Sequence, residues 1–462
     1  MLRPCLNKGS RFELLKRESL ISDVNYNKGS IKILFVYPNF YKVAISSLAW
    51  QFVYFQLNSI EFISCHRAVW DFSDPLVSLE TGQHWSKYDM IAFHFSYELD
   101  YLNFIDILKL NNIPLLAKDR DDNFPIIFAG GIAISLFPDI LLDFVDFVVA
   151  GEVEIFLQNL KSIFDIQGNI SKFEFIEAIS QKDNIYSKFS KEKKFKVNKK
   201  MDLIPFSPII TSMSYFKSNL LIEIGRGCPS FCFFCAASYL KKYPIFIRKN
   251  KIIELLENLD LRKVEKIGLL ASSLGFYPDL KEILEYILSL HKTVSLSSLR
   301  PEIVDEELCY LIDKHNMFTI TFAPETGSQE DRYKLNKKFD DEKLFHALEL
   351  INRLTGVKKI RYYFMIGFGF SDEENKIIRF LEKSKKYFDK SISVSINPFI
   401  PKKKTPFENN PFADVKVLKK QYQKLRKELS KLNINYSFES IKKAKIQYEL
   451  SNFKDSIYKY TE

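Results

Sequence analysis

The chain has 462 residues, more than one ordinary domain holds, so two or three domains are expected. Hydrophobic residues make up 46% of it and charged residues 27%, which excludes a disordered or fibrous protein. The net charge of +10 suits a partner that carries phosphates, but a lysine-biased chain shows the same charge on surfaces that only meet water.

The N-terminal sequence does not have the features of a secretory signal, because charges interrupt it and a long apolar core is missing. The longest apolar tract, residues 126–151, contains Asp139, Asp143 and Asp146, which argues against a membrane span. The six cysteines show no paired spacing, which favours a reducing compartment. We therefore expect a cytoplasmic protein without a membrane partner.

Four apolar runs beyond the first 30 residues predict strands that are buried on both faces: residues 31–38, 88–96, 125–133 and 146–152. Segments of helical length separate them, which predicts a doubly wound, Rossmann-like parallel sheet. Small residues end these runs at the sheet edge where such folds bind ligands, namely Ser96, Gly130, Gly131 and Gly151. Tight turns explain the glycines equally well.

Residues 160–210 are rich in Lys, Ser, Asn and Asp and predict a connection of helix and loop, with a domain boundary near residue 200. Six more strand-like runs follow it: Ser218–Gly227, Lys266–Gly275, Thr293–Arg300, Phe318–Thr326, Lys358–Gly367 and Ile392–Ile400. Each gap has room for a helix, so the runs predict a partial (β/α)6 barrel of the TIM type. Sites in such barrels lie at the carboxyl ends of the strands.

Three cysteines, Cys228, Cys232 and Cys235, directly follow the first of these strands. Thiolates suit zinc or iron–sulfur clusters, but a closed zinc site takes four ligands, and no fourth Cys or His lies within 50 residues. A 4Fe-4S cluster normally takes four cysteines, so three would leave one iron with an exchangeable position. That open position indicates a catalytic cluster.

The order Cys-x3-Cys-x2-Cys, with Phe234 before the last cysteine, resembles the signature of the radical S-adenosylmethionine (radical SAM) superfamily. The blocks "SLSSLRPE", "TFAPETGSQEDRYKLNK" and "YYFMIGFG" are similar to later parts of its core. The block "AGGIAISLFPDILLDFVDFVVAGEVE" is similar to the cobalamin-binding-like N-terminal domain of a subgroup of uncharacterised bacterial members. The resemblance spans about residues 30–410.

This resemblance divides the chain into four parts. They are an N-terminal extension (1–30), a cobalamin-binding-like Rossmann domain with its linker (31–200), a radical SAM core (201–410) and a basic helical tail (411–462). It also implies that a 4Fe-4S cluster binds S-adenosylmethionine and, once reduced by a flavodoxin- or ferredoxin-type protein, cleaves it to a 5′-deoxyadenosyl radical.

Residue roles follow from the same resemblance. The cluster ligands would be Cys228, Cys232 and Cys235, and S-adenosylmethionine would meet residues at the strand ends: Phe234, Ser272, Ser273, Ser298, Arg300, Glu325, Ile366 and Gly367. Ser272 and Ser273 stand where relatives often have Gly-Gly-Glu, so backbone carbonyls would have to replace that contact. An ion pair at the barrel mouth explains Arg300 and Glu325 equally well.

The N-terminal resemblance implies cobalamin as a possible third cofactor, with methyl transfer as the reaction. Its site would include Ser96, Gly130, Gly131 and Gly151. The Asp-x-His-x-x-Gly signature that supplies a lower axial histidine is absent, and His66 and His94 lack that context. Relatives without the signature can hold cobalamin with no histidine below the metal, so its absence does not exclude this cofactor. Methylthiotransferase activity is disfavoured, because it uses a second three-cysteine cluster and the N-terminal region has only Cys5 and Cys65.

Three other functions stay open. One is a superfamily enzyme that modifies RNA or protein without cobalamin, another is a non-catalytic iron–sulfur protein that binds RNA, and the third is a sheet domain that only binds a partner. The tail from Pro411 holds 12 Lys plus Arg against 6 Asp plus Glu, but its aromatic residues and arginine do not interleave in the way that stacks on and reads bases. A solvated basic helix is the simpler interpretation. The sequence identifies neither the substrate nor the oligomeric state.

Overall fold

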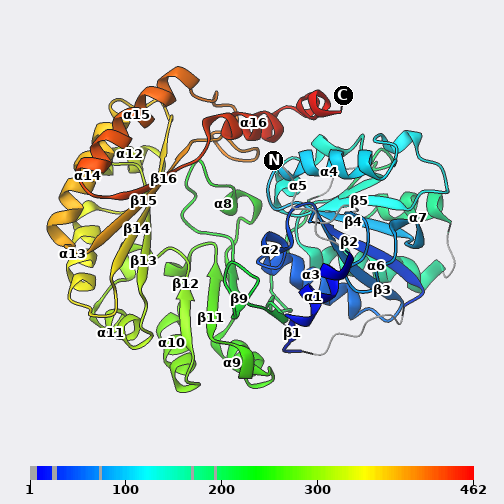
Figure 1. Ribbon diagram of the computed structural model, residues 1–462, viewed down its shortest axis with the longest axis horizontal. Coiled ribbons are helices and arrows are strands. Elements are labelled where there is room, and N and C mark those ends of the chain that lie inside the picture. Colours follow the sequence, from blue (N-terminus) through cyan, green and yellow to red (C-terminus); the bar gives the residue numbers. More distant parts are fainter. Residues whose placement is uncertain (1–7, 23–28, 72–74, 168–170, 192–194, 462) are drawn as a thin grey trace. The chain divides into compact units, whose positions relative to one another are not determined.

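The computed structural model describes residues 8–22, 29–71, 75–167, 171–191 and 195–461. Residues 1–7 and 23–28 of the predicted N-terminal extension, Cys5 among them, lie outside these ranges. The chain forms two compact α/β units (Figure 1). Unit 1 comprises residues 1–220, 259–264 and 449–462, and unit 2 comprises residues 221–258 and 265–448. In the part of the chain that is described, no helix has the length and apolarity needed to span a membrane.

Unit 1 contains eight described strands and seven described α-helices. The strands are β1 (Ser19–Leu20), β2 (Ile31–Tyr37), β3 (Ile63–Val69), β4 (Met90–His94), β5 (Ile126–Gly130), β6 (Phe147–Val149), β7 (Ile185–Tyr186) and β8 (Ile209–Ile210). The helices are α1 (Lys8–Lys16), α2 (Tyr41–Ala44), α3 (Leu48–Asn58), α4 (Asp100–Leu110), α5 (Ile132–Leu136), α6 (Val153–Gln167) and α7 (Lys172–Ser180). Short 3-10 turns are η1 (Trp85–Lys87), η2 (Ala117–Asp119), η3 (Pro138–Leu141), η4 (Leu261–Lys263) and η7 (Lys454–Tyr460).

The main sheet of unit 1 has the order β3-β2-β4-β5-β6-β7. Its first five strands are parallel, and β7 pairs antiparallel with β6. Side chains of helices α3, α6 and α7 pack on one face of the sheet, as in the contact of Phe128 on β5 with Phe156 on α6. Helix α4 packs on the other face, where Phe104 contacts Phe93 on β4. Helices on both faces of a parallel sheet confirm the predicted doubly wound fold.

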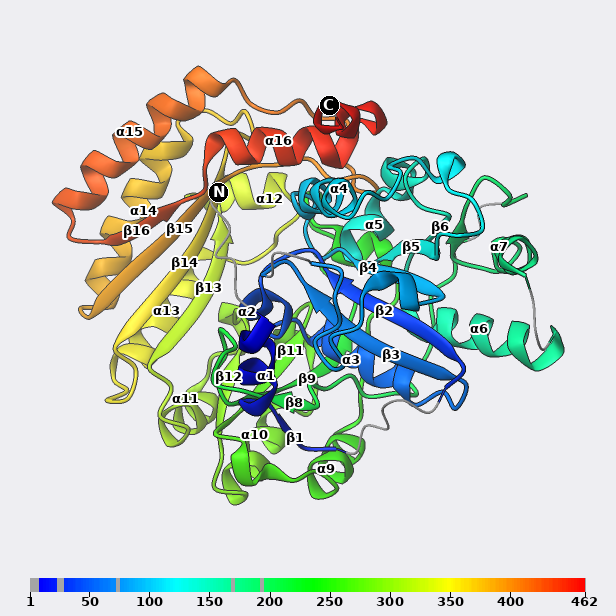
Figure 2. The ribbon, with the colours of Figure 1, turned by 45° about the vertical axis from the view of Figure 1, so that its right-hand side comes forward.

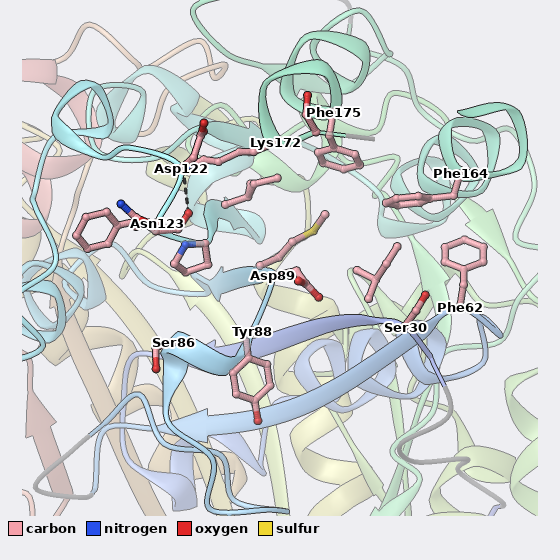
Figure 3. A pocket seen from close by; sticks show the side chains of 16 residues that line it. Ser30, Phe62, Ser86, Tyr88, Asp89, Asp122, Asn123, Phe164, Lys172 and Phe175 are labelled. Atoms are coloured by element: carbon pink, nitrogen blue, oxygen red, sulfur yellow. Dashed lines mark hydrogen bonds between the residues drawn. The ribbon is translucent and has the colours of Figure 1, made fainter. Parts of the chain in front are cut away.

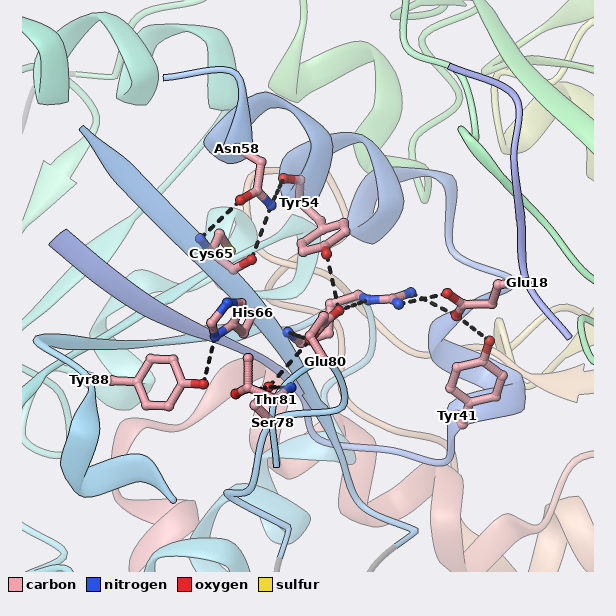
Figure 4. A network of polar contacts seen from close by, with 11 residues as sticks. Glu18, Tyr41, Tyr54, Asn58, Cys65, His66, Ser78, Glu80, Thr81 and Tyr88 are labelled. Carbon is pink, nitrogen blue, oxygen red and sulfur yellow. Dashed lines mark hydrogen bonds and ion pairs between the residues drawn. The ribbon is translucent and has the colours of Figure 1, made fainter. Parts of the chain in front are cut away.

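A buried charge network fastens the segment after α1 to this sheet (Figure 4). The side chain of Arg67 on β3 is only 1% exposed, and its guanidinium lies 2.7 Å from Glu18 and 2.7 Å from Glu80. The hydroxyl of Tyr41 donates to Glu18, and that of Tyr54 donates to Glu80. The N-terminal segment is therefore part of the folded core of unit 1.

Unit 2 contains the six predicted barrel strands. Its described strands are β9 (Asn219–Arg226, shared with unit 1 at its start), β10 (Ile245–Phe246), β11 (Lys266–Ala271), β12 (Thr293–Leu296), β13 (Thr319–Glu325), β14 (Lys359–Ile366), β15 (Ser391–Pro398) and β16 (Asn435–Phe438). The helices are α8 (Ala236–Leu240), α9 (Lys249–Glu257), α10 (Leu280–Ser289), α11 (Glu306–Lys314), α12 (Gln329–Lys334), α13 (Asp341–Asn352), α14 (Glu373–Tyr387), α15 (Val415–Lys431) and α16 (Ile441–Asn452), with 3-10 turns η5 (Leu274–Phe276) and η6 (Pro301–Ile303).

These strands form two sheets with the orders β10-β9-β11-β12 and β13-β14-β15-β16. A parallel bridge between Leu299 and Phe322 joins them, so β9, β11, β12, β13, β14 and β15 follow one another in a curved wall. Helices α13, α14 and α15 run along the outer side of the second sheet (Figures 1 and 2). The arrangement confirms the predicted partial barrel.

The tail contains a strand that the sequence analysis did not predict. Strand β16 pairs parallel with β15 and extends the second sheet. Helix α15 buries an apolar stripe, Leu418, Tyr422, Leu425 and Leu429, and turns its lysines outward. The helical prediction for α15 is confirmed, and the stripe explains how so basic a helix packs.

The last residues of the chain belong to unit 1. Tyr458 donates a 2.8 Å hydrogen bond to Asp143, and Lys454 forms a 2.9 Å ion pair with the same carboxylate. Ser451 donates to the buried Glu98 beside the start of α4. The tail therefore ends in a docked segment rather than in a free helix.

Candidate active site

The cysteine loop is a strand-to-helix turn at the carboxyl end of β9. Gly227 starts it with φ of +77°, and a Cβ there would come within 3.0 Å of the Lys241 carbonyl, so the turn requires glycine. Cys228, Cys232 and Cys235 follow, and Cys235 is the residue that precedes α8. The backbone N–H of Cys235 donates to the Cys232 carbonyl at 3.1 Å. The loop thus stands where barrel folds carry their sites.

The three thiols influence one another electrostatically. The pKa of Cys232 is raised to about 11, chiefly by burial; the ammonium of Lys337 acts against this rise, and the neighbouring Cys235 and Cys228 thiols add to it. Burial also raises the pKa of Cys235. Among the described residues, no three His, Cys, Asp or Glu side chains converge closely enough to hold a single metal ion. Three thiols on one loop nevertheless fit the donor set of an iron–sulfur cluster, whose irons sit at separate corners.

The turn after α12, in the connection between β13 and β14, holds the cysteine loop. The backbone N–H of Phe233 donates to the Leu335 carbonyl at 2.9 Å. The side-chain amide of Asn336 donates to the carbonyls of Ser230 at 3.2 Å and Phe231 at 2.8 Å. Leu335 to Lys338, which follow α12, therefore act as a bracket for the loop, and we call them the loop bracket.

Lys337 of the loop bracket brings a positive charge to the cysteines. Its Nζ forms a 2.7 Å ion pair with Glu325 at the end of β13, and both side chains are about 15% exposed. The same ammonium lies 5.9 Å from the centre of the Phe234 ring. Glu325 has φ of +65°, a strained conformation for this residue type that follows a bulge in the β13–β14 pairing.

Arg300 does not pair with Glu325; it contacts the cysteine loop. It donates to Ser230 Oγ at 3.0 Å, pairs with Glu302 at 2.9 Å and donates to the Lys338 carbonyl at 2.9 Å. Arg300 and Glu325 thus have separate partners, and the ion pair between them that the sequence allowed is not formed. Arg300 thus links the cysteine loop, through Ser230, to the loop bracket, through the Lys338 carbonyl.

The other predicted cofactor residues lie at the strand ends but differ in their contacts. Ser272 and Ser273 follow β11 and Ser298 follows β12, and none of the three makes a side-chain hydrogen bond with the described part of the chain. Ile366 ends β14 as a buried residue, and Gly367 takes φ of +90°. The ring of Phe368 beside it lies 6.2 Å from that of Phe234, so this edge adjoins the cysteine loop.

Unit 1 presents a second candidate edge at its topological switch point, where the carboxyl ends of β2 and β4 are neighbours. The rings of Tyr37 and His94 lie 5.4 Å apart there, and Ser96 Oγ lies 2.9 Å from Nε2 of His94. Asn39 donates to Asp100 at 2.7 Å, and burial raises the pKa of Asp100 to about 7. Burial lowers the pKa of His94 to about 4, so its ring stays neutral at pH 7.

The predicted glycines at this edge have structural reasons for being glycine. Gly131 follows Gly130 with φ of +115°, and a Cβ would come 2.3 Å from the Phe95 carbonyl oxygen. Gly151 has φ of +101°, and its N–H donates to Ser135 Oγ at 2.7 Å. Tight turns account for both positions, and they also bring backbone to the edge.

A cavity of about 650 Å³ lies at the opposite edge of the unit 1 sheet, by the amino ends of β2, β4 and β5. Figure 3 shows Phe62, Phe164 and Phe175 on one side of it and Asp122 and Asn123 on the other. None of the predicted site residues lines it. The cavity therefore adds no support to the predicted sites.

Asn336 and Lys337 were missed by the sequence analysis, although both lie in the block "TFAPETGSQEDRYKLNK". They come from a turn about 100 residues after the cysteines, and only the parallel arrangement of the barrel strands brings them to the loop. The strand-end rule does not find them, because they follow a helix rather than a strand.

Asn336→Ala is expected to destabilise the folded conformation of the cysteine loop by about 1–2 kcal/mol, because it removes two hydrogen bonds to loop carbonyls. Reconstituted protein should then lose iron to a chelator about tenfold faster than the unsubstituted chain, followed by absorbance. The matched control is Asn433→Ala. Asn433 also follows a helix with φ of +52°, against +55° for Asn336, but its side chain makes no hydrogen bond within the described ranges. Equal iron loss in both variants would contradict the bracket role.

Two family models match the chain. Residues 49–187 match the N-terminal part of radical SAM proteins, and residues 222–381 match the radical SAM superfamily. The uncharacterised protein MJ0966 of Methanocaldococcus jannaschii is 30% identical over 436 residues, which cover 92% of this chain and 86% of the relative.

Solved structures share the fold. TsrM of Kitasatospora setae, a radical S-adenosylmethionine methyltransferase, has a TM-score of 0.58 at 12% identity over 82% of this chain and 75% of TsrM. OxsB, a cobalamin-dependent S-adenosylmethionine radical enzyme, has a TM-score of 0.57 at 15% identity over 76% of this chain and 52% of OxsB, so this chain spans about half the length of OxsB. Together with the relative and the family models, these findings show that the chain belongs to the radical SAM superfamily, whose enzymes use a 4Fe-4S cluster and S-adenosylmethionine.

Proposed function

We propose that this chain cleaves S-adenosylmethionine reductively, with Cys228, Cys232 and Cys235 as the ligands of its cluster. The observation that carries the proposal is the placement of the three thiols on the turn after the first barrel strand, beside the ammonium of Lys337. A bound 4Fe-4S cluster would supply the electron that splits S-adenosylmethionine into methionine and a 5′-deoxyadenosyl radical.

The chain's own residues prepare this site. Arg300 and Asn336 hold the loop through the hydroxyl of Ser230 and the carbonyls of Ser230 and Phe231. The positive charge of Lys337 lowers the pKa of Cys232 and Cys235, so it favours their thiolate forms and offsets the repulsion between them. The ring of Phe234, within the loop, lies 6.2 Å from that of Phe368, which follows β14.

The test is anaerobic reconstitution with iron and sulfide, followed by dithionite and S-adenosylmethionine. The reconstituted chain is expected to release 5′-deoxyadenosine, measured by chromatography, and the chain treated without iron is expected to release none. Failure of the wild type to release it, with an intact cluster seen in its absorbance, would count against the proposal. A flavodoxin- or ferredoxin-type protein is the reductant that we expect to replace dithionite.

Cobalamin-dependent methyl transfer is the finer proposal. Its support is the similarity in fold to OxsB and TsrM, together with the polar switch-point edge of unit 1, which carries Asn39, Ser96 and Asp100. Because Nε2 of His94 already faces Ser96 Oγ, the edge fits a cobalamin without an axial histidine. Protein purified with excess hydroxocobalamin should carry the absorbance of bound cobalamin, and colourless protein would remove this cofactor.

Modification of RNA or protein without cobalamin is the alternative, and it draws on the lysines that α15 turns outward. RNA binding that weakens steeply with salt would favour it.

A further inference from the structure

One face of the sheet β13-β14-β15-β16 is polar. Along β14 and β15 every second residue is buried against the helices: Ile360, Tyr362, Phe364, Ile392, Val394 and Ile396. The residues between them point to the opposite face. That face carries Thr321, Arg361, Tyr363, Ser393, Ser395 and Ser437, which we call the polar face. Bulky apolar side chains normally fill the interior of a closed barrel.

The strand register places these side chains next to one another. Thr321 pairs with Arg361, and Arg361 pairs with Ser393. In the next row towards the carboxyl ends, Tyr363 pairs with Ser395, and Ser395 pairs with Ser437. Paired positions on neighbouring parallel strands are about 4.8 Å apart, so the two rows form a continuous hydrogen-bonding surface.

The polar face has unused binding capacity. Arg361 is exposed and makes no ion pair or hydrogen bond within the described residues. Ser393 is 8% exposed, and its hydroxyl has no hydrogen-bond partner. A buried hydroxyl without a partner is rare in a folded protein and requires an explanation. A bound ligand supplies one.

The polar face leads to the candidate active site. Tyr363 precedes Met365 and Ile366, which lie at the carboxyl edge with Glu325 and its partner Lys337. Arg361 lies roughly 13 Å from Met365 along the strand, at about 3.3 Å per residue. One small molecule held by Arg361 would therefore extend from the middle of the sheet towards the cysteine loop.

We propose that the polar face binds the substrate, and that the substrate is a hydrophilic organic anion. A carboxylate or phosphate meets the guanidinium of Arg361, which presents two parallel N–H donors to either group. A ring of the substrate packs on Tyr363, and its hydroxyl or amide groups bond Ser393 and Ser395. This inference rests on the proposed function, because it names the substrate class of the same site.

The test uses the full chain, reconstituted and supplied with S-adenosylmethionine, and three small probes. Phenyl phosphate and benzoate carry an anion beside a ring, and benzyl alcohol is the neutral counterpart. Ligand-observed NMR titration should show at least one anion binding about tenfold more tightly than the alcohol. The anion that binds more tightly identifies the group, phosphate or carboxylate. Equal binding of all three probes would overturn the inference.

Arg361→Gln should weaken the preferred anion about tenfold and leave benzyl alcohol unchanged. Arg361→Lys keeps the charge but not the paired donors, so its affinity for the anion should lie between those of the unsubstituted chain and Arg361→Gln. The matched control is Arg379→Gln, on the outer helix α14, where Arg379 is 60% exposed and pairs with Asp372. It should bind like the unsubstituted chain. If Arg361→Gln binds the anion as well as this control does, the polar face is not the anion site.

The binding readout separates this inference from the proposed function. A chain that releases 5′-deoxyadenosine but shows no Arg361-dependent anion binding keeps the proposed function and loses the inference. Arg361-dependent anion binding without any 5′-deoxyadenosine release keeps the anion site and loses the radical chemistry.

Discussion

Arg67→Met is expected to lower the free energy of unfolding of unit 1 by about 3–5 kcal/mol. The guanidinium is 1% exposed, and its partners Glu18 and Glu80 are 8% and 11% exposed, so all three charges are shielded from water. Burial alone would lower the pKa of Arg67, but the two carboxylates outweigh it and raise that pKa, so the network keeps its cation. Methionine fills much of the same volume but leaves two buried carboxylates without a counter-charge.

The measurement is urea unfolding followed by tryptophan fluorescence, since the guanidinium lies 5.7 Å from the Trp50 ring. The matched control is Arg262→Met, also in unit 1. Arg262 is 88% exposed and pairs with Asp260 at 2.7 Å, and an exposed pair of this kind contributes about 0–1 kcal/mol. Adding Glu18→Gln and Glu80→Gln to Arg67→Met should recover part of the loss. Similar stability of Arg67→Met and Arg262→Met would show that the network is not needed to hold the N-terminal segment.

Strand β3 shows why part of the fold could not be predicted from the sequence. Its residues, Ile63–Val69, include His66 and Arg67, and all seven are buried. An apolar run signals a buried strand, but a buried strand with three polar side chains, Ser64, His66 and Arg67, gives no such signal. The strand can bury His66 and Arg67 because residues outside the strand bind them: the hydroxyl of Tyr88 lies 2.8 Å from His66, and Glu18 and Glu80 neutralise Arg67.

Strand β16 was missed for a related reason. Its four residues, Asn435–Phe438, are largely exposed and sit between two basic helices, so local composition predicts more helix. The pairing with β15 and the contact of Phe438 with Tyr422 determine the strand. In contrast, the six core strands were predictable because each combines continuous or alternating apolar residues with a turn at its end.

The candidate site divides in the same way. The three cysteines are close in sequence, so their spacing alone indicated a cluster. Lys337 and Asn336 reach the loop only through the packing of two sheets, and Arg300 binds Ser230 because of how the loop folds. The predicted residues do lie at the ends of the barrel strands, and their assignment as a cofactor site stays a prediction.

Cys228→Ala, Cys232→Ala and Cys235→Ala are each expected to abolish cluster retention and 5′-deoxyadenosine release. A 4Fe-4S cluster held by only two thiolates has two open irons and is readily lost, so iron should fall from about four per chain to near the level of unreconstituted protein. The measurements are iron content and absorbance after desalting, and chromatography of the nucleoside product. All three variants should behave alike, because on the proposed assignment each thiol would bind one iron of the cluster.

The matched control is Cys309→Ala, in α11 of the same unit. Burial raises the pKa of Cys309 to about 11, and its side chain is 5% exposed, so it resembles Cys232 in environment but stands apart from the cysteine loop. This variant should keep its iron and its product, with only a modest loss of stability from the smaller side chain. Because both substitutions remove one buried thiol, a difference between them isolates ligation from packing. If a loop variant kept four irons and full product release, the cluster would have to be held by other residues.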